Sequence, residues 1–140
     1  MRSRGFSLIE IMVVVVILGI LASIVVPKII SRPDEARVVK AKQDVLALQN
    51  ALELYKLDNG FYPSTDQGLS ALVEKPTTPP EPRDWHQYLP SMPKDPWNRE
   101  YLYLNPGEHG EIDVFTYGAA GEPGGTGINA EIGNWDEKKQ

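Results

Sequence analysis

The sequence predicts an α+β protein in which a long N-terminal helix, half membrane-spanning and half amphipathic, packs on a small C-terminal antiparallel β-sheet. Three patterns carry this prediction: an apolar run over residues 6–26, an apolar stripe at helical spacing over residues 38–55, and two strand-like segments flanking a turn within residues 101–117. With 140 residues, the chain has room for one modest domain beside the apolar run.

The apolar run comes first, and Glu10 is its only formal charge. As a helix, residues 6–26 would be about 32 Å long, close to the roughly 30 Å thickness of the bilayer hydrocarbon. The run does not end in the small-residue cleavage site of an ordinary signal peptide, so we expect residues 6–30 to be retained as a transmembrane helix. Basic residues lie on both sides of it, so the charge count alone does not set its orientation.

Glu10 needs an explanation, because an ionised carboxylate inside a membrane costs a few kcal/mol unless it is shallow, protonated or paired. One interpretation places Glu10 at the headgroup level, where it is merely tolerated. The other pairs it with a positive group from another subunit, since its own chain has no basic side chain within helical reach on the C-terminal side. The residues by themselves leave both open.

Pro27 follows the run and predicts a kink or a melted turn, because proline removes one backbone donor from a helix. The sequence from Ser31 to Glu35 then has the hydroxyl and early acids of a helix start. We expect an amphipathic half over residues 31–60, ending near Asn59 and Gly60. Its apolar stripe consists of Val38, Ala41, Val45, Leu48, Leu52 and Tyr55.

The stripe is too short to favour a coiled coil, so we expect it to pack on the protein's own sheet. Leu46 and Leu54 lie off the stripe, and we expect them to widen the contact face.

Residues 61–140 form the predicted globular domain. Ser64 and Gln67 suggest a capping box before a short helix containing Leu69, Leu72 and Val73. Seven prolines in residues 76–96 exclude a regular helix or a central strand there, and we expect Trp85, Tyr88 and Trp97 to pin this loop onto the domain. Residues 101–117 read as a β-hairpin, and residues 118–135 as a glycine-rich loop that needs an anchor.

Composition excludes several classes of function. The chain has no cysteine and only two histidines, so it can form neither disulfides nor a three-histidine zinc site. Residues 61–140 carry thirteen acidic and six basic side chains, which argues against nucleic-acid binding. An enzymatic hypothesis would enlist His86 or His109 with Asp84 or Glu111, but surface histidines in turns are the commoner case. We predict that the protein is not an enzyme.

The segment from Arg4 to Val14, which reads RGFSLIEIMVV, resembles the class III leader and hydrophobic segment of type IV pilins and type II secretion pseudopilins. The resemblance implies that residues 1–5 are a leader, which a prepilin peptidase removes by cleavage between Gly5 and Phe6. Phe6 would then be N-methylated, and Glu10 would pair with the N-terminus of a neighbouring subunit. It also implies a single-pass protein of a Gram-negative inner membrane, with residues 61–140 in the periplasm.

Further motifs narrow the resemblance to the major pseudopilins of type II secretion systems: residues 55–63 (YKLDNGFYP), 66–69 (DQGL), 95–97 (DPW) and 132–135 (IGNW). This resemblance implies a homo-oligomeric helical filament that pushes folded proteins through an outer-membrane secretin. The implied partners are minor pseudopilins, the prepilin peptidase, and an inner-membrane assembly platform with its ATPase.

Those pseudopilins tether the C-terminal loop with calcium, and here the sequence departs from their pattern. Ala120 replaces a usual aspartate ligand, while Asn129 and Glu131 match later aspartates. Calcium takes about six to eight oxygen ligands and binds more tightly as anionic ligands are added. We therefore prefer a hydrogen-bonded, metal-free loop and expect no cofactor. The alternative is a weak calcium site made by Asn129, Glu131 and the carbonyls of Tyr117 and Glu122.

Two other functions remain open. The chain could be a pilin-like subunit of another machine, or a monomeric, membrane-anchored periplasmic binding module whose aromatic loop faces a ligand. Glu10 discriminates between a filament subunit and a monomer, because a monomer has no use for a carboxylate in its membrane helix.

Overall fold

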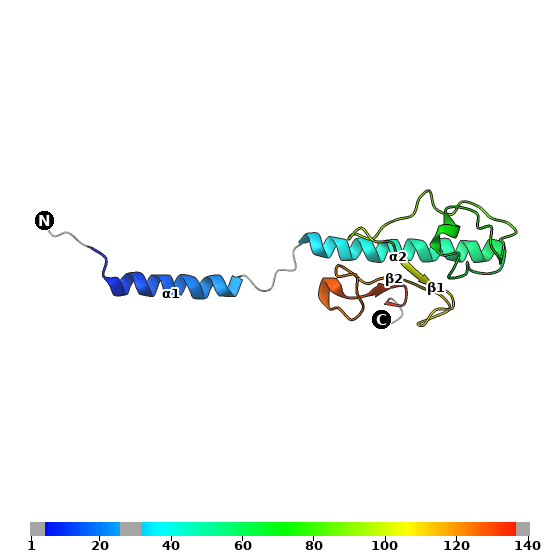
Figure 1. Ribbon diagram of the computed structural model, residues 1–140. Helices are drawn as coiled ribbons and strands as arrows, with labels where there is room; N and C mark the ends of the chain where they lie inside the picture. The colour runs from blue at the N-terminus through cyan, green and yellow to red at the C-terminus, as the bar shows by residue number, and fades with distance from the viewer. Residues whose placement is uncertain (1–4, 26–31, 137–140) are drawn as a thin grey trace. The chain divides into compact units, whose positions relative to one another are not determined.

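The computed structural model describes residues 5–25 and 32–136, which form two compact units that we treat separately. The first unit contains helix α1, Leu8–Val25, and the second begins with helix α2, Arg32–Asn59 (Figure 1). Pro27 and Ser31, the predicted break and cap, lie outside the described residues, as do residues 1–4 of the predicted leader.

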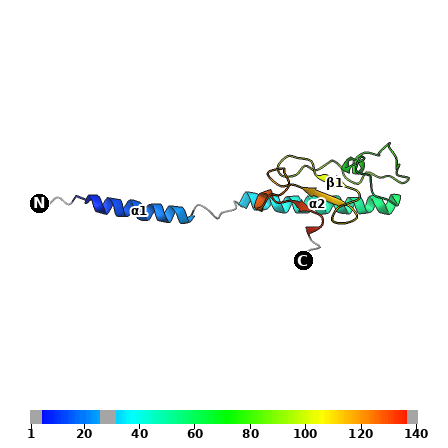
Figure 2. The same ribbon diagram turned by 60° about the horizontal axis from the view of Figure 1, so that its bottom comes forward.

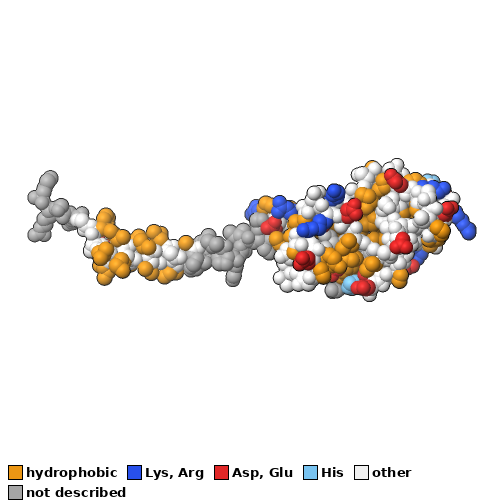
Figure 3. Space-filling model, viewed as in Figure 1, with side chains coloured by type: hydrophobic (Ala, Val, Ile, Leu, Met, Phe, Trp, Pro, Cys, Tyr) orange, Lys and Arg blue, Asp and Glu red, His pale blue; other side chains and the backbone are white. Residues whose placement is uncertain are grey.

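Helix α1 is apolar on every face. Its large hydrophobic side chains between Leu8 and Leu21 are all at least half exposed, and Figure 3 shows hydrophobic side chains along the face of this helix that is in view. A helix with this pattern is stable in a membrane or a protein core rather than in water. Within residues 5–25 and 32–136, however, no helix satisfies the length and hydropathy required to cross a membrane.

Helix α2 presents the predicted stripe to the core. Five of its six residues are buried, and Val38 is partly buried against them. The helix ends as predicted: Gly60 has a φ of 85°, the left-handed conformation that follows many helix ends, and its N–H donates to the carbonyl of Lys56 at 2.7 Å.

The prediction for Leu46 and Leu54 was wrong. Leu46 is 43% exposed and Leu54 is 53% exposed, so neither widens the core face. At about 100° per residue, both project from the side of α2 opposite the stripe. Val39 and Leu57 are exposed on the same side.

The sheet contains three antiparallel strands in the order β1, β2, β3, and it lies beside α2 in both ribbon views (Figures 1 and 2). Strands β1 (Leu102–Leu104) and β2 (Asp113–Thr116) form the predicted hairpin, with Tyr103 opposite Val114. Strand β3 (Ile132–Gly133) was missed, because residues 118–135 were all assigned to a loop. A two-residue strand is too short to show the alternation that identifies strands.

The predicted short helix is the 3-10 helix η1, Leu69–Leu72, and a second 3-10 helix, η2, spans Gly127–Asn129. Ser64 and Gln67 form the expected reciprocal pair: the Ser64 N–H donates to the Gln67 Oε1 at 3.0 Å, and the Gln67 N–H donates to the Ser64 Oγ at 3.1 Å. The pair closes the turn before η1 but does not cap it, because the N-cap of η1 is Gly68, which has no side-chain cap hydrogen bond. Residues 76–96 contain no helix or strand beyond one isolated bridge from Lys94.

Candidate functional site

The backbone around Gly5 and Phe6 is non-helical and exposed, directly before α1 begins at Leu8. Phe6 is 83% exposed. A Cβ added to Gly5 would meet no described atom within 4 Å, and Gly5 does not adopt the left-handed conformation that favours glycine. The described structure therefore gives no steric reason for a glycine at position 5, and an open peptide at the edge of a helix is accessible to a protease.

Glu10 has a local partner that the sequence analysis overlooked. Its Oε2 accepts a hydrogen bond from the Ser7 N–H at 3.2 Å, and its own N–H donates to the Ser7 Oγ at 3.2 Å. This is a capping box, in which the N-cap serine and the third helical residue satisfy each other's backbone N–H groups. The Ser-x-x-Glu spacing in the sequence was the available signal. The carboxylate thus accepts one local hydrogen bond and keeps capacity for a charged partner.

The aromatic loop packs onto its own domain, as predicted. The Trp85 Nε1 donates to the Ala71 carbonyl at 2.7 Å, and the Tyr88 hydroxyl donates to the Asp58 Oδ2 at 2.8 Å. Trp85, Tyr88 and Trp97 are all packed against the core. Burial, followed by the hydrogen bond to Asp58, raises the pKa of Tyr88 to about 12. These rings therefore serve to hold the proline-rich loop on the domain.

The two histidines lie in different surroundings, and each is close to an aspartate. The His86 Nε2 lies 3.2 Å from the Asp84 Oδ1, and both side chains are mostly exposed. The His109 Nδ1 lies 2.9 Å from the Oδ2 of Asp113, while its ring stacks on Trp135 at 3.8 Å between centroids. Asp113 also accepts the N–H groups of Glu108 and His109. That carboxylate closes the hairpin turn, so its partnership with His109 is structural.

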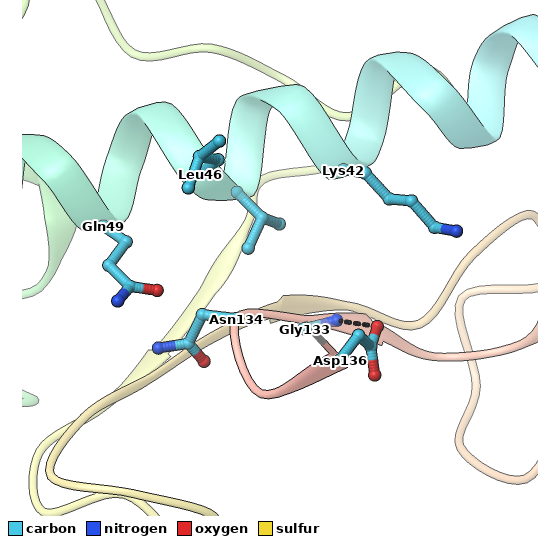
Figure 4. A pocket seen from close by; sticks show the side chains of 7 residues that line it. Lys42, Leu46, Gln49, Gly133, Asn134 and Asp136 are labelled. Carbon is cyan, nitrogen blue, oxygen red and sulfur yellow. Dashed lines mark hydrogen bonds between the residues drawn. The ribbon is translucent and has the colours of Figure 1, made fainter. Parts of the chain in front are cut away.

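An open groove of about 390 Å³ lies between α2 and the turn after β3 (Figure 4). Figure 4 shows Gln49 pointing from α2 toward Asn134, with Lys42 further along the helix above Gly133 and Asp136. Asn134 is already engaged, since its Oδ1 accepts the Val114 N–H at 3.1 Å and its Nδ2 donates to the Ile112 carbonyl at 3.0 Å. The side chain of Asn134 thus continues the contacts of the sheet one residue beyond β3.

The predicted calcium positions lack one of the anionic ligands expected from the resemblance. Ala120 has no carboxylate, while Glu122 and Glu131 are exposed. Across residues 5–25 and 32–136, no group of three or more histidine, cysteine, aspartate or glutamate side chains could hold a metal ion. The carbonyls of Gly118 and Ala119, beside Ala120, instead accept hydrogen bonds from the guanidinium of Arg99. The sequence analysis gave Arg99 no role.

Sequence profiles of two families match the chain. Residues 28–135 match the family described as type II secretion system (T2SS), protein G, and residues 1–26 match the prokaryotic N-terminal methylation motif.

Curated relatives named type II secretion system core protein G align over nearly the whole chain. The relative from Pseudomonas aeruginosa is 58% identical and that from Vibrio cholerae 57% identical; the alignments cover 96% of this chain and 96% and 93% of those proteins, respectively. The chain is also similar to the crystal structure of the major pseudopilin from the type 2 secretion system of enterohaemorrhagic Escherichia coli. The TM-score is 0.69, with 46% identity over 79% of this chain and 92% of that one.

Proposed function

The chain belongs to the type II secretion system protein G family of major pseudopilins, a non-enzyme family, and from that premise we propose how it works. It is the repeating subunit of a helical filament whose core is formed by α1. The observation that supports this most strongly is the exposure of apolar side chains on every face of α1. Such a surface needs a bilayer before assembly and other copies of the same helix afterwards.

In this proposal the newly made chain is a single-pass protein of the inner membrane, with its acidic C-terminal unit in the periplasm. A prepilin peptidase cuts between Gly5 and Phe6 and methylates the new amino group. The exposed backbone there, and the open space around Gly5, support this site. Because the fold does not require Gly5, the glycine serves recognition by the peptidase.

Glu10 would then accept the positive N-terminus of a neighbouring subunit while remaining capped by Ser7. Burying a carboxylate in an apolar filament core is unfavourable unless it is paired with a positive charge. Minor pseudopilins would start the filament, an assembly platform and its ATPase would extend it, and its growth would push folded proteins through the outer-membrane secretin. Pro27 would let the helix bend where it leaves the membrane.

Three substitutions of Glu10 test the charge pairing. Glu10→Ala removes both the cap and the charge, whereas Glu10→Gln keeps an acceptor suited to a capping box. We expect both variants to insert and to be cleaved normally but to form no filaments and secrete no protein. Glu10→Asp, which keeps the charge, should retain partial assembly. Normal filaments from Glu10→Gln would show that Glu10 is only a cap.

Mass spectrometry of the protein from its native membrane tests the processing step. The mature chain should begin at Phe6 and carry one added methyl group. Gly5→Ala should block cleavage, while Gly19→Ala, a matched change within α1 where a Cβ also meets nothing within 4 Å, should not. A mature chain that retains residues 1–5 in secreting cells would refute the proposal.

A further inference from the structure

The glycine-rich loop that follows β2 is held by a side chain from a distant turn. The Arg99 Nη1 donates hydrogen bonds to the carbonyls of Gly118 and Ala119, at 3.3 and 3.0 Å. A cationic donor binds carbonyl oxygens more strongly than a neutral one does. One guanidinium thus engages two successive carbonyls at the point where the chain leaves the sheet.

The turn that carries Arg99 is itself held by hydrogen bonds to a buried carboxylate. Asp95, 3% exposed, accepts the Arg99 N–H on its Oδ1 at 2.8 Å and the Thr116 hydroxyl on its Oδ2 at 2.6 Å. The Thr116 Oγ1 in turn accepts the Gly118 N–H at 3.3 Å. Asp95 therefore fixes both the base of Arg99 and the start of the loop.

Gly121 completes the arrangement. It has a φ of 71°, and a Cβ placed on it would lie 2.5 Å from the Arg99 Cζ. Only glycine lets the loop backbone lie against the guanidinium at this position. Gly124 has a φ of 87° but open space around it, so the two glycines share a conformation and differ in contact with Arg99.

We propose that the Arg99 guanidinium takes the place of a calcium ion in tethering the glycine-rich loop of this chain. A metal ion and a guanidinium both satisfy carbonyl oxygens with positive charge, and two cations held close together repel each other. The carbonyls that Arg99 engages, those of Gly118 and Ala119, lie between Tyr117 and Glu122, whose carbonyls the alternative calcium site would use. The missing carboxylate at Ala120 fits this substitution, because a guanidinium already brings the positive charge that calcium would supply. This inference concerns the chain's own loop and holds whether or not the filament proposal is correct.

Calcium addition gives the first test. Amide hydrogen exchange and the melting temperature of the detergent-solubilised full chain would be compared in EDTA and in about 5 mM calcium, above the weakest affinities of extracellular calcium modules. We expect no change in either measurement. Slower exchange over residues 117–130, or a higher melting temperature, in calcium would overturn the proposal.

Removing the guanidinium gives the second test. Arg99→Met keeps an unbranched stem but loses the donors, and we expect the Ala119 amide, which donates to the Ile128 carbonyl at 2.9 Å, to exchange about fivefold faster. Arg83→Met, at another exposed arginine, is the matched control and should leave loop exchange unchanged. Unchanged loop exchange in Arg99→Met would also refute the tether.

Alanine substitutions at Gly121 and Gly124 give a third test, which does not depend on whether Arg99→Met folds. Gly121→Ala and Gly124→Ala both strain a left-handed backbone, but only Gly121→Ala also displaces Arg99. Gly121→Ala should therefore speed loop exchange more than Gly124→Ala does. Equal effects of the two alanine substitutions would contradict the proposal.

Discussion

Ser7 and Glu10 cap helix α1 reciprocally, each supplying a side-chain oxygen to the other's backbone N–H at 3.2 Å. The Ser7 carbonyl also accepts the first helical hydrogen bond, from the Ile11 N–H at 3.3 Å. The cap holds the Glu10 carboxylate at the very start of the helix, only four residues after Phe6. The same contact that starts the helix therefore also fixes where the charge lies.

Ser7→Ala should fray the first turn of α1, because losing an N-cap side chain costs about 1 kcal/mol. We expect the Glu10 amide of the detergent-solubilised chain to exchange about fivefold faster, while α2 is unaffected. Ser7→Thr keeps the oxygen and should restore slow exchange. If Ser7→Ala leaves the Glu10 amide as protected as before, the cap does not operate in the micelle.

Two leucines on α2 should differ sharply in their contribution to stability. Leu48 is fully buried and Leu57 is 79% exposed. Leu48→Ala should lower the free energy of unfolding by about 2–5 kcal/mol through lost burial and a cavity, whereas Leu57→Ala should change it by less than about 0.5 kcal/mol. Urea denaturation followed by tryptophan fluorescence measures both. Similar losses would show that the assignment of the helix faces is wrong.

Helical periodicity made α2 predictable, since its stripe repeats often enough to define one face and Gly60 marks its end. The hairpin was predictable for a similar reason, because Tyr101 to Leu104 and Ile112 to Tyr117 flank an evident turn. Leu46 and Leu54 were misplaced because hydrophobicity was given more weight than helical angle. A leucine in the sequence does not by itself show whether it is buried; its position relative to the stripe does.

Contacts between distant segments could not be predicted. The Arg99 tether joins residues that are about twenty positions apart through backbone carbonyls, which carry no signal in the sequence. Strand β3 is likewise defined by antiparallel backbone pairing with Phe115 and Thr116 of β2, which lie well before it in the chain. The Ser-x-x-Glu spacing of the capping box at Ser7 and Glu10 was visible in the sequence. It was overlooked because Glu10 was considered only as a charge within the apolar run, and not as a helix cap.

Tyr55→Phe should leave the protein as stable or make it more stable. Among the described residues, the Tyr55 hydroxyl is buried without a hydrogen-bond partner, and burial raises its pKa. An unsatisfied buried polar group costs about 1–3 kcal/mol, so removing it relieves that penalty. Tyr103→Phe is the control and should be destabilising, because its hydroxyl donates to the Pro63 carbonyl at 2.6 Å. Clear destabilisation by Tyr55→Phe would mean that the hydroxyl has a partner in solution.

The chain should lose stability as the pH rises above about 10. Burial raises the pKa of Tyr88 to about 12, and burial also raises the pKa of Tyr101 and Tyr103. A tyrosine in the unfolded chain ionises near its ordinary pKa of about 10, so above that pH the folded state holds more protons than the unfolded state. The contribution of these protonated, buried tyrosines to the free energy of unfolding is therefore fully present below pH 10 and is lost as the pH rises toward 12.

Melting temperatures between pH 8 and pH 12 measure this loss. Tyr88→Phe should make the fall in melting temperature above pH 10 shallower, because phenylalanine has no hydroxyl proton to lose in either the folded or the unfolded state. Tyr117→Phe is the control, because it also removes one tyrosine hydroxyl, from a ring that packs on Phe115 and is only partly buried. A decline of equal slope in Tyr88→Phe and in the unmodified chain would show that burial of Tyr88 does not control the alkaline limit.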